Sequence, residues 1–223
     1  MIRLELVFKY YQLTEGNIVK AVDNVSAEFE KGDYVIIFGR SGSGKTTLLS
    51  LMAGLTSPTK GKIFFDGVEI SGLRDKEKAA LRNRKMGFVF QYPTLIPTLN
   101  IMDNVLLPAI LSEEASEQSQ EKARQLLKNV GLEDKVSVYP AQISSGQMRR
   151  VQIARALINN PPVVLADEPT GELDEATERE IMEFLKDIHR RGTSVIMVTH
   201  SSELASYATR LFKMDKGTLR EVG

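Results

Sequence analysis

The chain has 223 residues, 42% hydrophobic and 26% charged, which is enough to build an ordinary globular core. Its 29 Lys and Arg residues balance 29 Asp and Glu residues, and this zero net charge argues against a nucleic-acid partner. The lack of cysteine excludes disulfides and thiolate zinc sites and fits a reducing, cytoplasmic compartment. We see no signal-peptide core and no uncharged apolar stretch of about 18 residues, so a membrane role would require a partner.

The first ninety residues are predicted to be rich in strands. Alternating apolar residues predict strands over 2–9 and 18–30, joined by a turn-rich connection at 10–17. An apolar strand at 34–38 leads into a glycine-rich segment and a helix that ends near Gly54. The next predicted elements are a strand at 62–65, a short charged helix at about 74–84 and a strand at 86–90.

From Gln91 to about Asn160 the pattern becomes helical. Within 115–129 the apolar residues form a narrow stripe, namely Ala123, Leu126, Leu127 and Val130, and we interpret the region as an inserted helical lobe. Strands return at 162–166, 194–198 and 210–214, with a helix at about 175–190. Apolar strands that alternate with helices predict an α/β fold with a mostly parallel sheet.

Residues 39–46 read Gly-Arg-Ser-Gly-Ser-Gly-Lys-Thr, between a predicted strand and a predicted helix. This order matches the phosphate-loop pattern G-x-x-x-x-G-K-[ST], in which backbone N–H groups and a helix N-terminus surround an anion. Lys45 adds a positive charge for the phosphates, and the Thr46 hydroxyl can ligate Mg²⁺. The sequence therefore predicts that ATP is bound by Gly39, Arg40, Ser41, Gly42, Ser43, Gly44, Lys45, Thr46 and Thr47.

Polar residues follow three of the other predicted strands. Asp167 and Glu168 come after an apolar strand, where Asp167 can hold Mg²⁺ through its water shell and Glu168 can orient an attacking water. Gln91 follows the strand at 86–90 and can reach the metal, and His200 follows the strand at 194–198 and can contact the γ-phosphate. An acidic pair, a Gln or a His after a strand is usually structural when read alone, but the phosphate loop favours the catalytic interpretation.

Residues 143–147, Ile-Ser-Ser-Gly-Gln, begin a predicted helix that runs to Leu157. A Ser and a Gly at a helix start are ordinarily a cap. The same arrangement also makes an anion site, which a chain with one phosphate loop would use only on the ATP of a second copy.

Together these motifs resemble, in order and over the whole chain, an ATP-binding cassette (ABC) ATPase subunit. Residues 39–46 resemble Walker A, Gln91 the Q-loop, 143–147 the signature, 163–168 Walker B, 171–174 the D-loop, and His200 the switch histidine. Segments such as 87–91 and 166–171 are similar to the LolD/MacB/FtsE-like branch. The resemblance implies one domain over 1–223. It comprises a RecA-like P-loop NTPase core with an N-terminal antiparallel β subdomain (1–91 and 160–223) and a helical signature lobe (92–159).

The resemblance also implies further site residues and partners. Tyr11 is expected to stack on adenine, although Tyr10 is an alternative. Nucleotide contacts are further implied for Ser144, Ser145, Gly146, Gln147 and Asp174. The family works as an ATP-closed homodimer, bound to an integral membrane permease at the cytoplasmic face. We place the permease surface around 92–105, where the apolar residues Leu95, Ile96, Leu99, Ile101 and Met102 fit a buried core equally well.

One departure from the family pattern lies in the signature, where Ser145 replaces the first glycine of L-S-G-G-Q. If that position requires a positive φ, serine is strained there, and we expect weaker closure or slower turnover. Glu172, in the D-loop, is acidic where this branch often has Asn. An alternative function is therefore a nucleotide-dependent interaction module in which dimerisation matters more than hydrolysis.

Overall fold

The structure is a computed structural model that describes residues 1–14, 16–112 and 116–222. It divides into two compact units, one made of Met1–Ala79 with Ser194–Gly223 and the other of Ala80–Thr193. The predicted lobe boundaries at 92 and 159 stay a prediction.

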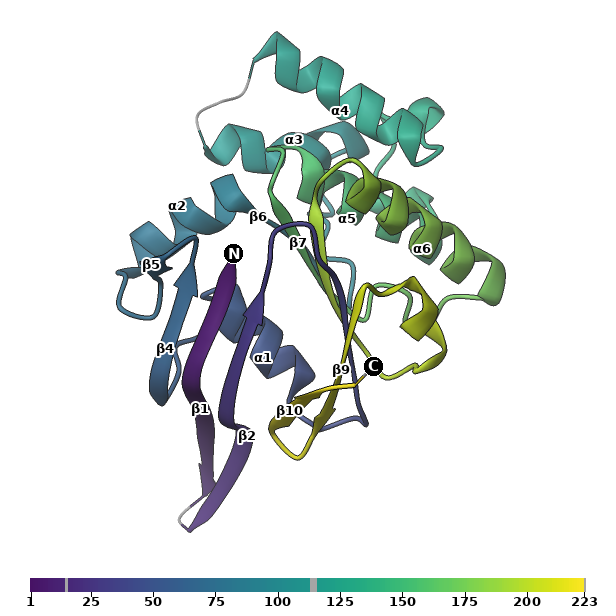
Figure 1. Ribbon diagram of the computed structural model, residues 1–223. Coiled ribbons are helices and arrows are strands. Elements are labelled where there is room, and N and C mark those ends of the chain that lie inside the picture. Colours follow the sequence, from purple (N-terminus) through teal and green to yellow (C-terminus); the bar gives the residue numbers. More distant parts are fainter. Residues whose placement is uncertain (15, 113–115, 223) are drawn as a thin grey trace. The chain divides into compact units, whose positions relative to one another are not determined.

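An antiparallel sheet opens the first unit, with the strand order β2-β1-β4-β5 (Figure 1). Its strands are β1 (Ile2–Thr14), β2 (Asn17–Phe29), β4 (Lys60–Phe65) and β5 (Val68–Glu69). The predicted antiparallel β subdomain is confirmed. The predicted connection at 10–17 is wrong. Tyr10 pairs with Lys20 and Tyr11 with Val19, so the pairing of β1 with β2 continues through most of this segment. Aromatic and β-branched residues favour such cross-strand pairs.

The first unit also holds parallel strands. Between β3 (Tyr34–Phe38) and the helix α1 (Lys45–Met52) lies the glycine-rich loop. β3 pairs in parallel with both β8 (Ser194–Thr199) and β9 (Arg210–Asp215), and β10 (Thr218–Glu221) returns antiparallel to β9 after the short helix η3 (Glu203–Tyr207). Because β3 and β8 are buried along most of their length, both read as continuous apolar runs.

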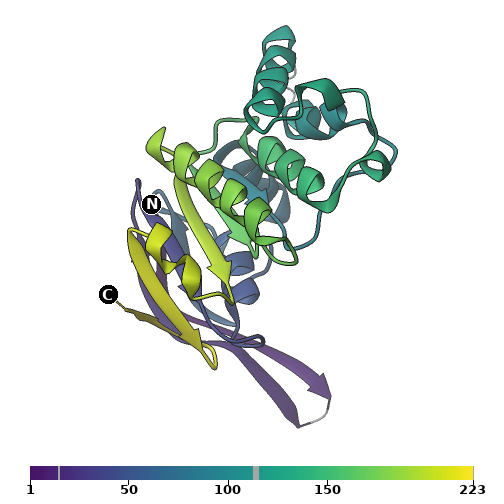
Figure 2. The ribbon, with the colours of Figure 1, turned by 90° about the vertical axis from the view of Figure 1, so that its right-hand side faces the viewer.

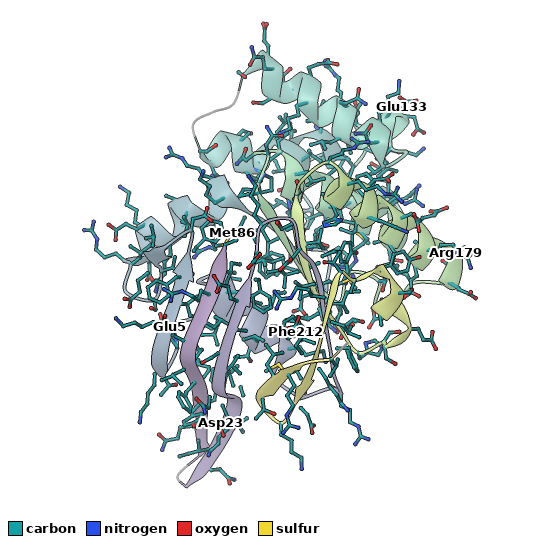
Figure 3. The ribbon with its side chains drawn as sticks, in the orientation of Figure 1. Glu5, Asp23, Met86, Glu133, Arg179 and Phe212 are labelled. Atoms are coloured by element: carbon teal, nitrogen blue, oxygen red, sulfur yellow. The ribbon has the colours of Figure 1, made fainter. Side chains whose placement is uncertain are left out.

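An aromatic contact joins the antiparallel sheet to these strands within the first unit. The ring of Phe212 on β9, labelled in Figure 3, meets the ring of Phe29 on β2 edge-on, with 5.4 Å between their centroids. Phe29 is fully buried and Phe212 nearly so. Such edge-to-face pairs contribute about 1 kcal/mol beyond their buried area.

The second unit contains a parallel strand pair and most of the helices. β6 (Met86–Val89) pairs in parallel with β7 (Val163–Asp167). The helices are α2 (Asp75–Lys85, which begins in the first unit's range), α3 (Ile101–Leu111), α4 (Glu117–Asn129), α5 (Ser145–Leu157) and α6 (Glu175–Arg190), with short turns η1 (Glu133–Lys135) and η2 (Pro140–Gln142). The parallel pairs of both units confirm the predicted fold class, and the helices predicted at 74–84 and 175–190 are confirmed within a residue.

Helices α3, α4 and α5 share one apolar core, and they lie together at the top of Figure 2. Ala123, Leu127 and Val130 of the predicted stripe are buried in it. Leu95 and Ile101 are buried there too, whereas the side chains of Tyr92 and Ile96 are exposed. Burial therefore fits the core interpretation for Leu95 and Ile101, and the permease surface stays a prediction. Among the described residues, no helix combines the length and apolarity that crossing a bilayer requires.

Candidate functional site

The phosphate loop joins the end of β3 to the start of α1. Gly42 and Gly44 have φ values of 76° and 104°, a region that favours glycine. A Cβ atom on Gly44 would lie 1.9 Å from the carbonyl oxygen of Ala21, and one on Gly39 would lie 2.2 Å from that of Met214. These approaches leave no room for a side chain, so the glycines are required for the tight turn as well as for access to a ligand.

Lys45 is buried beneath this loop. Its Nζ donates to the carbonyl oxygens of Gly39 and Arg40, at 2.8 and 3.1 Å, and thus spans the inner side of the turn. The hydroxyl of Ser43 is buried and has no hydrogen-bond partner among the described residues. A buried cation, an unsatisfied hydroxyl and a glycine cradle at a helix N-terminus together fit a phosphate group.

The remaining loop residues are placed where a ligand can reach them. Arg40, Ser41, Gly42 and Thr46 are exposed, and Thr47 is half-buried. The Thr46 hydroxyl stands at the second position of α1, which fits the predicted Mg²⁺ ligand.

His200 lies beside the start of this loop. Phe38 of β3 pairs with Thr199 of β8, and the Gly39 N–H donates to the Thr199 carbonyl oxygen at 3.2 Å. The exposed His200 therefore follows a strand that ends next to the phosphate loop. Parallel pairing brings these two motifs, 160 positions apart in the sequence, to one sheet edge.

The two tyrosines of β1 differ in their surroundings. The Tyr10 hydroxyl donates to the Asp23 carboxylate at 2.6 Å, and this hydrogen bond lowers the pKa of Asp23 and raises the pKa of Tyr10. The Tyr11 ring is 40% exposed, with the Lys9 ammonium 5.0 Å from its centroid. This difference favours Tyr11 as the stacking residue, and its contact with adenine stays a prediction.

In the second unit, parallel pairing gathers Gln91, Asp167 and Glu168. Val89 of β6 pairs with Ala166 of β7. Asp167 is the last residue of β7, and Gln91 and Glu168 follow the same ends of the two strands. Asp167 is 5% exposed, and the Gln91 side chain is exposed. Glu168 has a φ of 45°, and its backbone carbonyl oxygen accepts a hydrogen bond from the Gly171 N–H at 3.1 Å. Glu168 therefore lies in a tight turn. A positive φ is uncommon for glutamate and often marks a functional turn.

The signature residues form the N-terminus of α5. The Ser144 hydroxyl accepts from the Gln147 N–H at 3.2 Å, and the Gln147 side chain accepts from the Ser144 N–H at 3.0 Å, a reciprocal capping box. Ser145 is the first residue of the helix, and it is absent from the described non-glycine residues with positive φ. The condition for strain at Ser145, a positive φ, is therefore not met, and a helical residue tolerates serine. The expected weaker closure stays a prediction. Asp174 caps α6 by accepting from the Thr177 N–H at 2.9 Å.

Arg149 was not predicted as a site residue, and it is only 3% exposed. Its guanidinium donates to the backbone carbonyl oxygens of Phe90 and Gln91. The available signal was a polar series at three-residue spacing, Arg149, Gln152 and Arg155, whose last two members alternate with the apolar residues Val151, Ile153 and Ala154.

The glycine cradle, the buried lysine and the strand–loop–helix context define a P-loop nucleotide-binding protein. The model of the ABC transporter family matches residues 22–171. The lipoprotein-releasing system ATP-binding protein LolD of Aquifex aeolicus is 41% identical, over 96% of this chain and 92% of that protein. YtrE, an ABC transporter ATP-binding protein of Bacillus subtilis, is 43% identical over 92% and 89%. A solved structure of the ATP-binding cassette MJ0796, described as a dimeric post-hydrolysis state bound to ADP and Pi, has a TM-score of 0.93 and 38% identity, and the match covers 100% of this chain and 98% of that one.

The chain belongs to the ABC transporter family, as an ATP-binding subunit with LolD-like relatives.

Proposed function

We propose that this subunit hydrolyses ATP to ADP and phosphate and couples the reaction to a separate transmembrane partner. The observation that carries hydrolysis is the position of Glu168, which follows a buried strand, with Gln91 two residues beyond the end of the paired strand. The solved relative described as a post-hydrolysis state supports the same reaction.

Each polar residue then has a definite task. When bound, ATP supplies the γ-phosphoryl group, and Mg²⁺ offsets the negative charge of the phosphates. Lys45 and the N–H groups of the loop hold the phosphates. Thr46 and Gln91 offer oxygen ligands for Mg²⁺, and Asp167 holds its water shell.

Glu168 and His200 act on the reacting end of the nucleotide. The Glu168 carboxylate accepts a hydrogen bond from the attacking water and orients it, and then takes up its proton. His200 donates a hydrogen bond to the γ-phosphate oxygens. Both residues stand in turns that directly follow buried strands, which limits their freedom to move away from these positions.

We further propose a homodimer in which Ser144, Ser145, Gly146 and Gln147 of one copy contact the ATP of the other. The dimeric description of the MJ0796 structures supports this arrangement. An integral membrane permease would bind at the exposed Tyr92 and Ile96 and hold the subunit at the cytoplasmic face of the membrane. The LolD relatives suggest lipoprotein release as one process of this type.

The test compares wild type with Glu168→Gln and with a matched control, Glu175→Gln, which changes an exposed glutamate in the first turn of α6. We expect the wild type and the control to release phosphate from Mg·ATP. Glu168→Gln should bind ATP normally and release phosphate about 100-fold more slowly or worse, because the water loses its hydrogen-bond acceptor. A Glu168→Gln variant with wild-type turnover would overturn the proposed role.

A further inference from the structure

The segment that carries Gln91 has no regular structure of its own. No helix or strand lies between the end of β6 at Val89 and the start of α3 at Ile101. A residue that must place an amide on a metal within a few tenths of an ångström needs support from elsewhere. That support comes from one side of α5.

Three polar side chains of α5 bind the backbone of this segment, and we call them the α5 clamp: Arg149, Gln152 and Arg155. The Gln152 Nε2 donates to the Tyr92 carbonyl oxygen at 3.3 Å. The Arg155 guanidinium donates to the Thr94 carbonyl oxygen at 2.8 Å and to the Thr94 hydroxyl at 2.7 Å. Arg149 adds bonds to the carbonyl oxygens of Phe90 and Gln91, so the clamp as a whole binds four of the five residues from Phe90 to Thr94.

The two Arg149 bonds have a particular consequence for Gln91. One fixes the carbonyl of the peptide group before Gln91, and the other fixes the carbonyl of the peptide group after it. Both planar groups attached to the Gln91 Cα are thereby anchored, which sets the direction of its Cα–Cβ bond. The side chain keeps only its χ angles and remains exposed for a ligand.

The buried Arg149 guanidinium has three acceptors for its Nη atoms, and its Nε has no hydrogen-bond partner among the described residues. Its Nη1 also donates to the Gln152 Oε1 at 3.1 Å, which orients the guanidinium. Burial lowers the pKa of Arg149, and the carboxylates of Glu172 and Asp167 oppose that shift. A planar guanidinium can serve two carbonyls at once, whereas a lysine ammonium acts as a single point charge.

We propose that Arg149 is a positioning residue for Gln91, which ties the Q-loop to the signature helix so that the two move as one body. The inference rests on the proposed function, because it assumes that Gln91 serves Mg·ATP. Arg149 lies only two residues beyond Gln147, so a displacement of the signature would carry the Gln91 backbone with it.

The test uses Arg149→Gln, Arg149→Lys and a matched control, Arg150→Gln. Arg150 is the next residue of the same helix, pairs with Glu180 and has no bond to 90–94 among the described residues. The backbone ¹⁵N order parameters of the four non-proline residues in 91–95 are measured by NMR without nucleotide. We expect them to fall from about 0.85, the value of a rigid backbone, to below about 0.6 in Arg149→Gln, to fall less in Arg149→Lys, and to match the wild type in the control.

Phosphate release is then measured against Mg²⁺ and ATP. We expect Arg149→Gln to lower kcat and raise the Mg²⁺ concentration for half-maximal rate about 10-fold each, as is typical when support for a metal ligand is lost. The KM for ATP should change less than about 2-fold, since the phosphate loop is intact. If Arg149→Gln does not fold, the Arg149→Lys results decide the question in the same way.

The inference is overturned if the order parameters of the non-proline residues in 91–95 are no lower in Arg149→Gln than in Arg150→Gln, or if kcat and the Mg²⁺ dependence match the control. The failure of the proposed function looks different, because then the wild type itself releases no phosphate. In that event the order parameters still decide whether Arg149 holds the segment.

Discussion

The buried side chain of Asn104 binds the backbone of the segment before α3, and the cost of removing it can be predicted quantitatively. Its Oδ1 accepts from the Ile96 N–H at 2.7 Å, and its Nδ2 donates to the carbonyl oxygens of Ile96, Leu99 and Asn100 at 3.0–3.1 Å. Asn104 itself is fully buried. Since an amide has two N–H hydrogens, the side chain supplies about three full hydrogen bonds.

Asn104→Ala should therefore be costly. Three hydrogen bonds at about 1 kcal/mol each, with an added penalty for the stranded Ile96 N–H, lower the free energy of unfolding by about 3–4 kcal/mol. The control is Asn100→Ala, four residues earlier, whose Oδ1 caps α3 by accepting from the Asp103 N–H at 2.8 Å. Loss of that cap costs about 1 kcal/mol.

Urea denaturation of the two variants and the wild type measures both costs by linear extrapolation. Hydrogen exchange at the Ile96 amide reports the local effect, with acceleration expected in Asn104→Ala beyond that in Asn100→Ala. Equal costs for the two variants, or an unchanged Ile96 amide, would refute the reasoning.

Three further predictions concern the nucleotide site. Gly44→Ala should lose ATP binding in a fluorescent-nucleotide titration, because its Cβ would lie 1.9 Å from the Ala21 carbonyl oxygen, whereas Gly67→Ala, with open space around its Cβ, should retain it. Ser145→Gly, in a Glu168→Gln background, should tighten the ATP-dependent dimer by removing a side chain from the signature, and a weaker dimer would contradict this. Asp174→Ala should lower the thermal midpoint at pH 7, measured by differential scanning fluorimetry. The Thr177 hydrogen bonds lower the pKa of Asp174, so the cap stabilises the folded state above the ordinary carboxyl pKa. The difference from wild type should shrink as the pH falls below about 4, and a difference that persists in acid would contradict the cap.

The local patterns predicted most of the fold because each one has a direct physical cause. The glycine-rich loop requires positive φ and close backbone approach. Gly42 has a positive φ, and Gly44 has both a positive φ and a close backbone neighbour. Continuous apolar runs predicted the buried parallel strands, and the stripe at Ala123 and Leu127 predicted which face of α4 is buried. Such features depend on residues that are neighbours in the sequence.

The errors arose where distant residues decide the outcome. The length of the β1–β2 hairpin depends on pairs such as Tyr11 with Val19, which the turn-forming residues nearby obscured. The strain at Ser145 depended on a positive φ, and the structure does not show one at this helical residue. The α5 clamp joins residues about 60 positions apart, so only the pairing of β6 with β7 and the packing of α5 bring it together.

The most direct test of the central claim is the molar mass of Glu168→Gln in solution, by light scattering after size exclusion, with and without ATP. If two copies of this variant close around two ATP molecules, the molar mass should double when ATP is added. It should return to that of the smaller species when ADP replaces ATP. A variant that binds ATP at Lys45 and keeps the same mass at all protein concentrations would contradict the proposed homodimer.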